Sequence, residues 1–337
     1  ILTSAGMFFY ALSPTLLPNH TYLGLLIGTV VFSVSAGLSE VLLSPTIAAI
    51  PSDDPQKAMS FLHSLYAFGV VAVVAVSTVF LKVFGHENWM YLMMLLALLP
   101  LIASAMFMLS PMPDMTSESA SAGTATAKRK TLGLALFVAC IFFGSCAENV
   151  MSNWISSYTE TALHIDKAVG DLLGMAMFAV LLGAGRMAYS KFGKNIRPVL
   201  LGGMFGAACC YLVAGLAHSA LAAFLACIFT GLFTAMLWPG TLIMMEETLP
   251  GVGVAAYALM AAGGDLGASV APQLMGAVID KVSASPYVAG LAAGLHLSAE
   301  QVGLKAGMLV SAFFPLAGTV LIVLMLRYFK NQRTRAC

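Results

Sequence analysis

Apolar segments of about twenty residues constrain the fold of this chain more than any other feature. A helix that crosses a bilayer needs about 20 mostly apolar residues. Ten segments have this character: 2–16, 22–50, 59–83, 88–109, 131–158, 168–191, 198–217, 220–245, 252–280 and 303–329. Lipid offers no hydrogen bonds to an exposed backbone, and no period-two barrel pattern is visible, so the segments are predicted to be helices. The sequence therefore predicts an all-α integral membrane protein.

The composition agrees with a membrane protein and excludes several other classes. Only 9% of the residues are charged and 60% are apolar, whereas about 25% are charged in soluble domains. The net charge is +1, and no basic stripe exists to hold a nucleic acid. The six cysteines have neither metal-ligand nor disulfide spacing. We expect no metal, no cofactor and no nucleic-acid partner.

The lysines and arginines predict the orientation of the chain. Twelve of the sixteen fall in one set of loops and helix ends, which includes Arg186, Lys191, Lys194 and Arg197. The other set holds Lys82, Lys167, Lys281 and Lys305. Positive residues gather on the cytoplasmic side. Ten spans then place both ends of this chain in the cytoplasm, in a multi-pass protein of the inner membrane.

One polar segment divides the predicted helices into two groups. Residues 110–130 are rich in Ser, Thr, Ala and Gly, a composition typical of flexible linkers. We predict a partial N-terminal bundle of four helices over 1–109 and a six-helix C-terminal bundle over 131–337. In the later loop 281–302, Ser298 and Gln301 are spaced as in a capping box, which predicts a helix start there.

An internal repeat relates the two groups at a constant offset of 194 residues. Gly37-Leu38 matches Gly231-Leu232, Pro45 matches Pro239, and Gly69 matches Gly263. The two prolines are predicted to kink their helices. Repeated halves are common in secondary transporters. The same offset places the first-half partners of 131–158 and 168–191 before Ile1, so we predict that two initial helices of a twelve-helix protein are missing here.

Several short stretches follow patterns known from one transporter family. They are Glu40-Val-Leu-Leu-Ser-Pro45, Phe61-Leu-His-Ser-Leu-Tyr-Ala-Phe-Gly69, Ala147-Glu148 with Asn153-Trp154 and Tyr158, and Gly264-Asp265-Leu-Gly267 with Pro272 and Gly276. With them the chain resembles the major facilitator superfamily over its full length, and its fucose-permease branch most. Gly185-Arg186 with Gly193 also resembles the family's cytoplasmic Gly-Arg loop motif.

The resemblance implies a major facilitator fold and transport by alternating access. It also implies proton symport, with Glu40 as the proton-coupling acid and a second acid on the first family helix, which this chain lacks. The Glu40 stretch has Val-Leu-Leu-Ser where that branch has Thr-Ala-Ala-Asn. A sugar is therefore one candidate solute among several.

Three carboxylates fall near the middle of predicted spans: Glu40, Glu148 and Asp265. A charged group at the bilayer centre costs about 2.5–3.5 kcal/mol or more, so such residues usually face a cavity and mark a functional site. Helical spacing puts small or polar residues on the face of each acid, a pattern that fits cavity lining or helix packing. The further candidates for a cavity or substrate site are Ser33, Ser44, His63, Ser145, Asn149, Ser152 and Trp238.

These observations favour a permease that moves a small polar solute together with protons. The chain contains neither a zinc-protease motif nor a Walker A sequence, and its acids are dispersed, so an enzyme is not expected. Two alternatives stay open: efflux of amphipathic compounds, and an inactive fragment of such a transporter. The expected partners are the lipid bilayer, protons and a small solute, and we expect a monomer.

Overall fold

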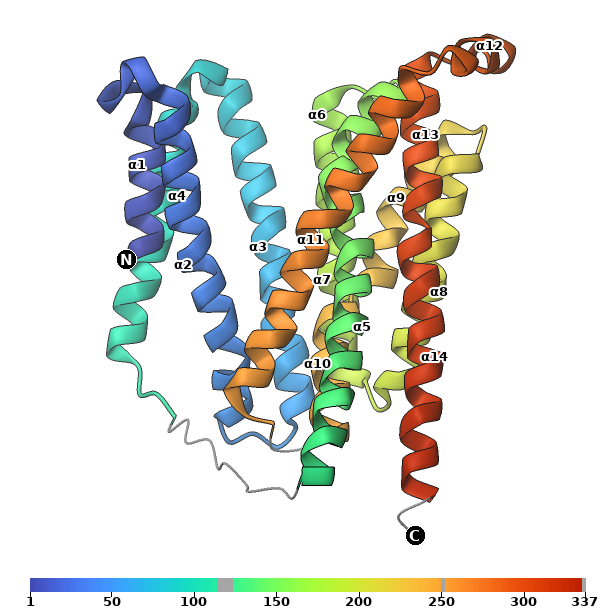
Figure 1. Ribbon diagram of the computed structural model, residues 1–337. Coiled ribbons are helices and arrows are strands. Elements are labelled where there is room, and N and C mark those ends of the chain that lie inside the picture. The colour runs from blue at the N-terminus through green and yellow to red at the C-terminus, as the bar shows by residue number, and fades with distance from the viewer. Residues whose placement is uncertain (114–123, 250–251, 335–337) are drawn as a thin grey trace. The chain divides into compact units, whose positions relative to one another are not determined.

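Helices form almost all of the computed structural model, which describes residues 1–113, 124–249 and 252–334 (Figure 1). The α-helices are α1 Leu2–Leu16, α2 Thr21–Ala49, α3 Pro55–Phe84, α4 Trp89–Leu109, α5 Thr124–Ser157, α6 Lys167–Val169, α7 Ala176–Phe192, α8 Ile196–Leu216, α9 Ala220–Thr234, α10 Leu237–Thr248, α11 Gly253–Ser283, α12 Pro286–Leu295, α13 Ala299–Ser311 and α14 Phe313–Thr334. Two 3₁₀ turns, Pro18–His20 and His86–Asn88, and two π-helical segments, Tyr158–Ala162 and Gly170–Met175, adjoin them. The all-α prediction is confirmed.

Nine helical stretches of the described residues are long and apolar enough to cross a membrane. They are Pro18–Ala49, Pro55–Phe84, His86–Leu109, Lys130–Ala162, Gly170–Phe192, Ile196–Leu216, Ala220–Thr248, Gly253–Ser283 and Ala299–Lys330. Each corresponds to one predicted span. The remaining predicted segment, 2–16, forms α1, which is helical as expected but only 15 residues long.

The chain divides into two compact units. The first comprises Ile1–Pro51 and Ala75–Thr116, and the second comprises Ser52–Val74 and Ser117–Cys337. Helix α3 therefore contributes residues to both units. The division at 110–130 stays a prediction: residues 114–123 of that linker lie outside the described ranges, and α5 already begins at Thr124.

Helix α1 packs against α2 and α4 in the first unit. The ring of Tyr10 lies edge-on to Phe32 on α2 and to Trp89 on α4, with centroid separations of 6.1 and 5.8 Å. Gly28 permits the close approach of α2, because a Cβ there would lie 2.8 Å from the Cα of Tyr10. Aromatic contacts and a small residue thus hold these helices together. This is expected in a membrane, where apolar lipid leaves no hydrophobic driving force for helix association and close packing takes its place.

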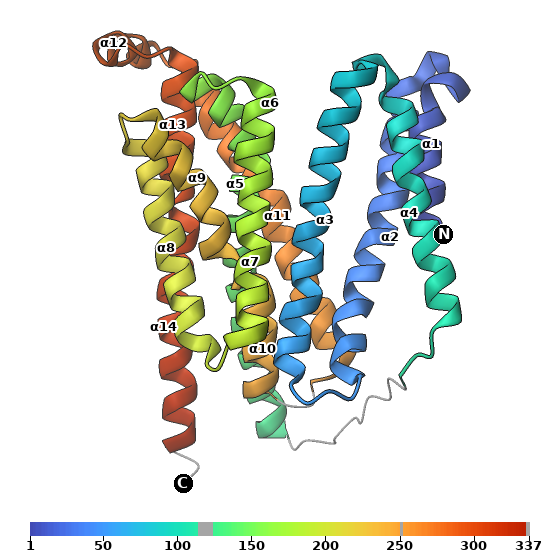
Figure 2. The same ribbon diagram turned by 180° about the vertical axis from the view of Figure 1, so that it is seen from behind.

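In the second unit α5 packs along α11, and α9 packs against both α7 and α8 (Figure 2). Glycines again permit the closest crossings. A Cβ at Gly231 on α9 would lie 2.2 Å from the carbonyl oxygen of Phe178 on α7, and a Cβ at Gly267 on α11 would lie 2.4 Å from that of Phe142 on α5. The short helix α12 extends beyond the end of the bundle (Figure 1).

Two of the predicted spans are interrupted in the second unit. The span 220–245 forms α9 and α10, which are separated at Ala235–Met236, shortly before Pro239. The span 303–329 is preceded by a helical start at Ala299 and is divided at Ala312 into α13 and α14. Ser298 and Gln301 form the predicted capping box, each side chain accepting from the other residue's backbone N–H.

The start of α3 is fixed by an acidic residue in the preceding loop. Asp54 accepts a hydrogen bond from the backbone N–H of Lys57 at 3.2 Å, and its carboxylate pairs with the Lys57 ammonium at 3.1 Å. Partial burial acts to raise the pKa of Asp54, but the hydrogen bonds and charge of Lys57 outweigh it and leave that pKa below its ordinary value. Asp54 thus remains ionised at neutral pH, and its negative charge stabilises the N-terminus of α3.

Candidate functional site

A buried ion pair joins α5 to α7 in the second unit. The Nη2 atom of Arg186 lies 3.1 Å from one carboxylate oxygen of Glu148 and 3.0 Å from the other. Arg186 is 1% exposed and Glu148 is 9% exposed. A charge in this environment is tolerated only where an opposite charge and hydrogen bonds compensate for lost hydration. The remaining contacts of Arg186 supply that compensation.

A proline on α10 provides the second partner of Arg186. Pro239 has no N–H, so the carbonyl of Ala235, four residues earlier, lacks its usual helical donor. The Nε atom of Arg186 donates to this carbonyl oxygen at 2.8 Å. Gly185 permits the approach, because a Cβ there would lie 2.6 Å from the Cβ of Ala235. The proline thus creates an acceptor that the adjacent Gly185-Arg186 pair uses.

The third partner of Arg186 belongs to the part of α3 that lies in the same unit. Its Nη1 atom donates to the carbonyl oxygen of His63 at 3.0 Å. The hydroxyl of Ser60 donates to the Arg186 carbonyl at 2.6 Å, and the guanidinium lies 5.9 Å from the ring centroid of Tyr66. The separation from Tyr66 fits a cation–π contact. One arginine therefore links α3, α5, α7 and the α9–α10 junction.

The structure adds detail to the sequence interpretation of Arg186. The sequence pattern counts Arg186 among the loops and helix ends of the cytoplasmic side and also within the span 168–191, and the structure places it inside α7, buried and paired. The structural reason is the partner set: Glu148 and two carbonyls stabilise the charge away from water. A usable signal was present, because residue 186 falls inside the predicted span 168–191, and an intramembrane arginine is functional by default.

The polar neighbours of Glu148 on α5 bond mainly within their own helix. The Asn149 amide donates to the carbonyl and hydroxyl oxygens of Ser145 at 3.0 and 3.1 Å, and Ser152 donates to the carbonyl of Asn149 at 3.2 Å. Ser145 is buried, whereas Asn149 and Ser152 are half-buried. The structure thus brings Ser145 and Asn149 together beside Glu148, and their role in lining a cavity stays a prediction.

The other candidates occupy separate places. In the first unit, Ser33 is exposed, Glu40 is half-exposed and Ser44 is buried, all on α2. In the second unit, the half-buried Trp238 packs on Gly264, where a Cβ would lie 2.2 Å from its ring.

Two candidates contribute to contacts through their backbone. Asp265 is exposed, and its carbonyl oxygen accepts a hydrogen bond from the Ser269 hydroxyl at 2.8 Å. His63 joins the Arg186 network through its backbone carbonyl, while its imidazole is half-buried. A titrating role for either side chain stays a prediction.

Comparison with known proteins identifies the family. The family model of the Major Facilitator Superfamily matches residues 1–272, more than half of the chain. The chain belongs to the Major Facilitator Superfamily. It is therefore a multi-pass membrane transporter. A comparison with curated protein sequences gives no match.

Solved structures of other transporters share the fold. The fucose:proton symporter FucP of E. coli has a TM-score of 0.64 and 16% identity, over 97% of this chain and 83% of that chain. A bacterial homologue of the human lysosomal transporter Spinster, in an inward-facing conformation, has a TM-score of 0.63 and 14% identity, over 98% of this chain and 83% of that one. The resemblance to the fucose-permease branch is thus confirmed at the level of the fold.

Proposed function

We propose that this superfamily member is a proton-coupled symporter that takes up a small polar solute by alternating access. The observation that carries the proposal is the buried network around Arg186 and Glu148. Charges inside a membrane span are expensive and mark ion or substrate pathways. This network joins four helical elements of one unit. A movement of these helices, or protonation of Glu148, would therefore change its hydrogen bonds.

Glu40 is the proposed proton-coupling residue. It is the one candidate acid on α2, and it is half-exposed. Glu148 is held by Arg186 at 3.0 Å, so its protonation would break a buried ion pair. The likeness to FucP, a fucose:proton symporter, adds weight to this assignment.

The solute is proposed to be uncharged and polar, and a sugar is the first class to test. Fucose is the natural first probe, because it is the solute of the structural neighbour FucP. Amphipathic efflux substrates form the alternative class. Uptake by right-side-out and inside-out vesicles separates import from export.

The test uses the intact protein in vesicles with an imposed pH gradient. Glu40→Gln should abolish uphill accumulation while sparing solute exchange, because a neutral amide resembles the protonated acid but releases no proton. Glu87→Gln is the matched control, since Glu87 is an exposed acid in a turn and should tolerate the change. Unchanged uphill uptake in Glu40→Gln would assign proton coupling to another acid. Loss of both uphill uptake and exchange would instead favour a role of Glu40 in binding the solute.

Several finer sequence predictions remain proposals. They are the inner-membrane location, the cytoplasmic placement of both ends, the monomeric state, and the division into 1–109 and 131–337. A reporter fused at either end of the intact protein would test the sidedness. Loss of the cytoplasmic signal at the C-terminus would overturn the orientation.

A further inference from the structure

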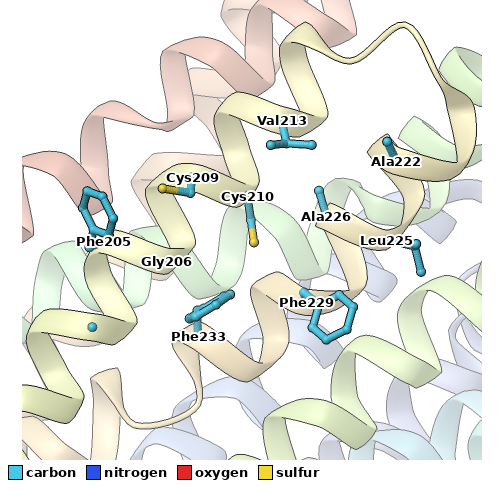
Figure 3. A pocket seen from close by; sticks show the side chains of 11 residues that line it. Phe205, Gly206, Cys209, Cys210, Val213, Ala222, Leu225, Ala226, Phe229 and Phe233 are labelled. Carbon is cyan, nitrogen blue, oxygen red and sulfur yellow. The ribbon is translucent and has the colours of Figure 1, made fainter.

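A lipid-facing groove runs along the seam between α8 and α9. Its larger part is a hollow of about 440 Å³ bounded by apolar residues and cysteines, among them Phe205, Cys209, Cys210 and Phe229 (Figure 3). Phe205 is 60% exposed and Phe229 is 44% exposed. These residues lie in membrane-spanning helices, so the hollow opens toward lipid rather than toward water.

A second hollow lies beside the first, toward the α7–α8 loop. It has a volume of about 370 Å³ and is bounded by Phe192, Gly193, Val199 and Gly203 among others. Phe233 borders both hollows. From Val199 to Val213 the α8 helix rises about 21 Å at about 1.5 Å per residue. One leaflet takes up about half of the roughly 30 Å hydrocarbon core, so an acyl chain of one leaflet fits within this length.

Glycines shape this groove. A Cβ at Gly206 would lie 2.1 Å from the ring of Phe233, so the ring fills the space that a side chain would occupy. A Cβ at Gly202, which borders the larger hollow, would meet no atom within 4 Å. The groove is therefore empty at Gly202 and can be filled there without a clash.

Three cations stand in or next to the α7–α8 loop, at this end of the groove. Lys191 and Lys194 are exposed and flank Phe192 and Gly193, and Arg197 is half-exposed at the start of α8. Among the described residues, none of the three side chains has a carboxylate within ion-pair distance. The N-terminus of the 21-residue helix α8 adds a partial positive charge at the same place.

We propose that this groove binds one anionic phospholipid, with an acyl chain between α8 and α9 and its phosphate at Lys191, Lys194 and Arg197. Two independent features carry the proposal: an apolar groove of acyl-chain length and a cluster of cations without acidic partners at its end. Basic pockets between helices are known to bind anionic headgroups. The site lies in the second unit and does not depend on which solute is transported.

The test compares two lipids with identical acyl chains, phosphatidylglycerol and phosphatidylcholine. Native mass spectrometry of the purified full chain should show one tightly retained phosphatidylglycerol. The triple variant Lys191→Gln/Lys194→Gln/Arg197→Gln should lose the preference by on the order of a hundredfold, since three cations act together. The charge-matched control Lys82→Gln/Lys281→Gln/Arg327→Gln removes three exposed cations elsewhere and should keep the preference.

A second variant tests the groove itself with all three cations present. Gly202→Leu should fill the larger hollow and abolish retention of phosphatidylglycerol, while its thermal unfolding midpoint stays near that of the wild type. Gly290→Leu, also at a glycine with open space around its Cβ, is the control. Inorganic phosphate should not displace the lipid.

Three results would overturn the proposal. One is equal retention of the two lipids by the wild type. Another is displacement by inorganic phosphate, which would reduce the site to a surface anion site. The third is a dimer that Gly202→Leu dissociates, which would assign the groove to a second copy of the chain.

Discussion

Replacing Arg186 by methionine should destabilise the protein more than any other single change at the candidate site. The substitution removes two hydrogen bonds to Glu148 and one each to the carbonyls of Ala235 and His63. It leaves a 9%-exposed carboxylate without its cation. Breaking a buried ion pair in this way costs about 3–5 kcal/mol. The unsatisfied Ala235 carbonyl adds about 1–3 kcal/mol, because Pro239 supplies no N–H.

The double variant Glu148→Met/Arg186→Met separates these two costs. An apolar pair of similar volume is often as stable as a buried ion pair, so the cost of the unpaired carboxylate should disappear. The carbonyl of Ala235 still lacks a donor, so recovery should be incomplete. We expect the double variant to be more stable than Arg186→Met by about 2–4 kcal/mol. Arg327→Met, at an exposed arginine, should have little effect.

The assay follows thermal unfolding in detergent with a thiol-reactive dye. Cys140, Cys146 and Cys227 are fully buried and should react only on unfolding. Midpoints are compared at one scan rate, since membrane proteins commonly unfold irreversibly. An Arg186→Met midpoint equal to that of the wild type would refute the reasoning. A double variant no more stable than Arg186→Met would show that the carboxylate is not the source of the cost.

Two smaller changes test local packing and capping. Gly231→Ala should destabilise the protein by about 1–3 kcal/mol, because its Cβ would lie 2.2 Å from the Phe178 carbonyl oxygen. Gly202→Ala is the control, since its Cβ meets open space and the change should be neutral. The thermal unfolding midpoints of the two variants test the difference. Ser298→Ala should lower the stability by about 1 kcal/mol, because the Ser298 hydroxyl oxygen accepts a hydrogen bond from the Gln301 N–H. Amide hydrogen exchange should become faster in the first turn of α13 and stay unchanged at the start of α8.

The places of nine long helices followed from local sequence. A bilayer acts on each window of about twenty residues separately, and lipid forces an apolar window into a helix whatever its neighbours. Nine predicted spans therefore appear as helices of sufficient length. The capping box at Ser298 is equally local, since its partners are three residues apart. Glu148 was also recognisable, because a carboxylate inside a span requires a compensating environment.

The partners of that carboxylate were decided only by the tertiary structure. Arg186 lies 38 residues from Glu148, 49 from Ala235 and 123 from His63, so no local pattern relates them. Each contact depends on helix rotation and on a close approach, which Gly185 permits and which the missing N–H of Pro239 makes favourable. The lipid groove likewise exists only where α8 and α9 meet. Sequence determined which segments enter the membrane, and packing determined which of their polar groups meet.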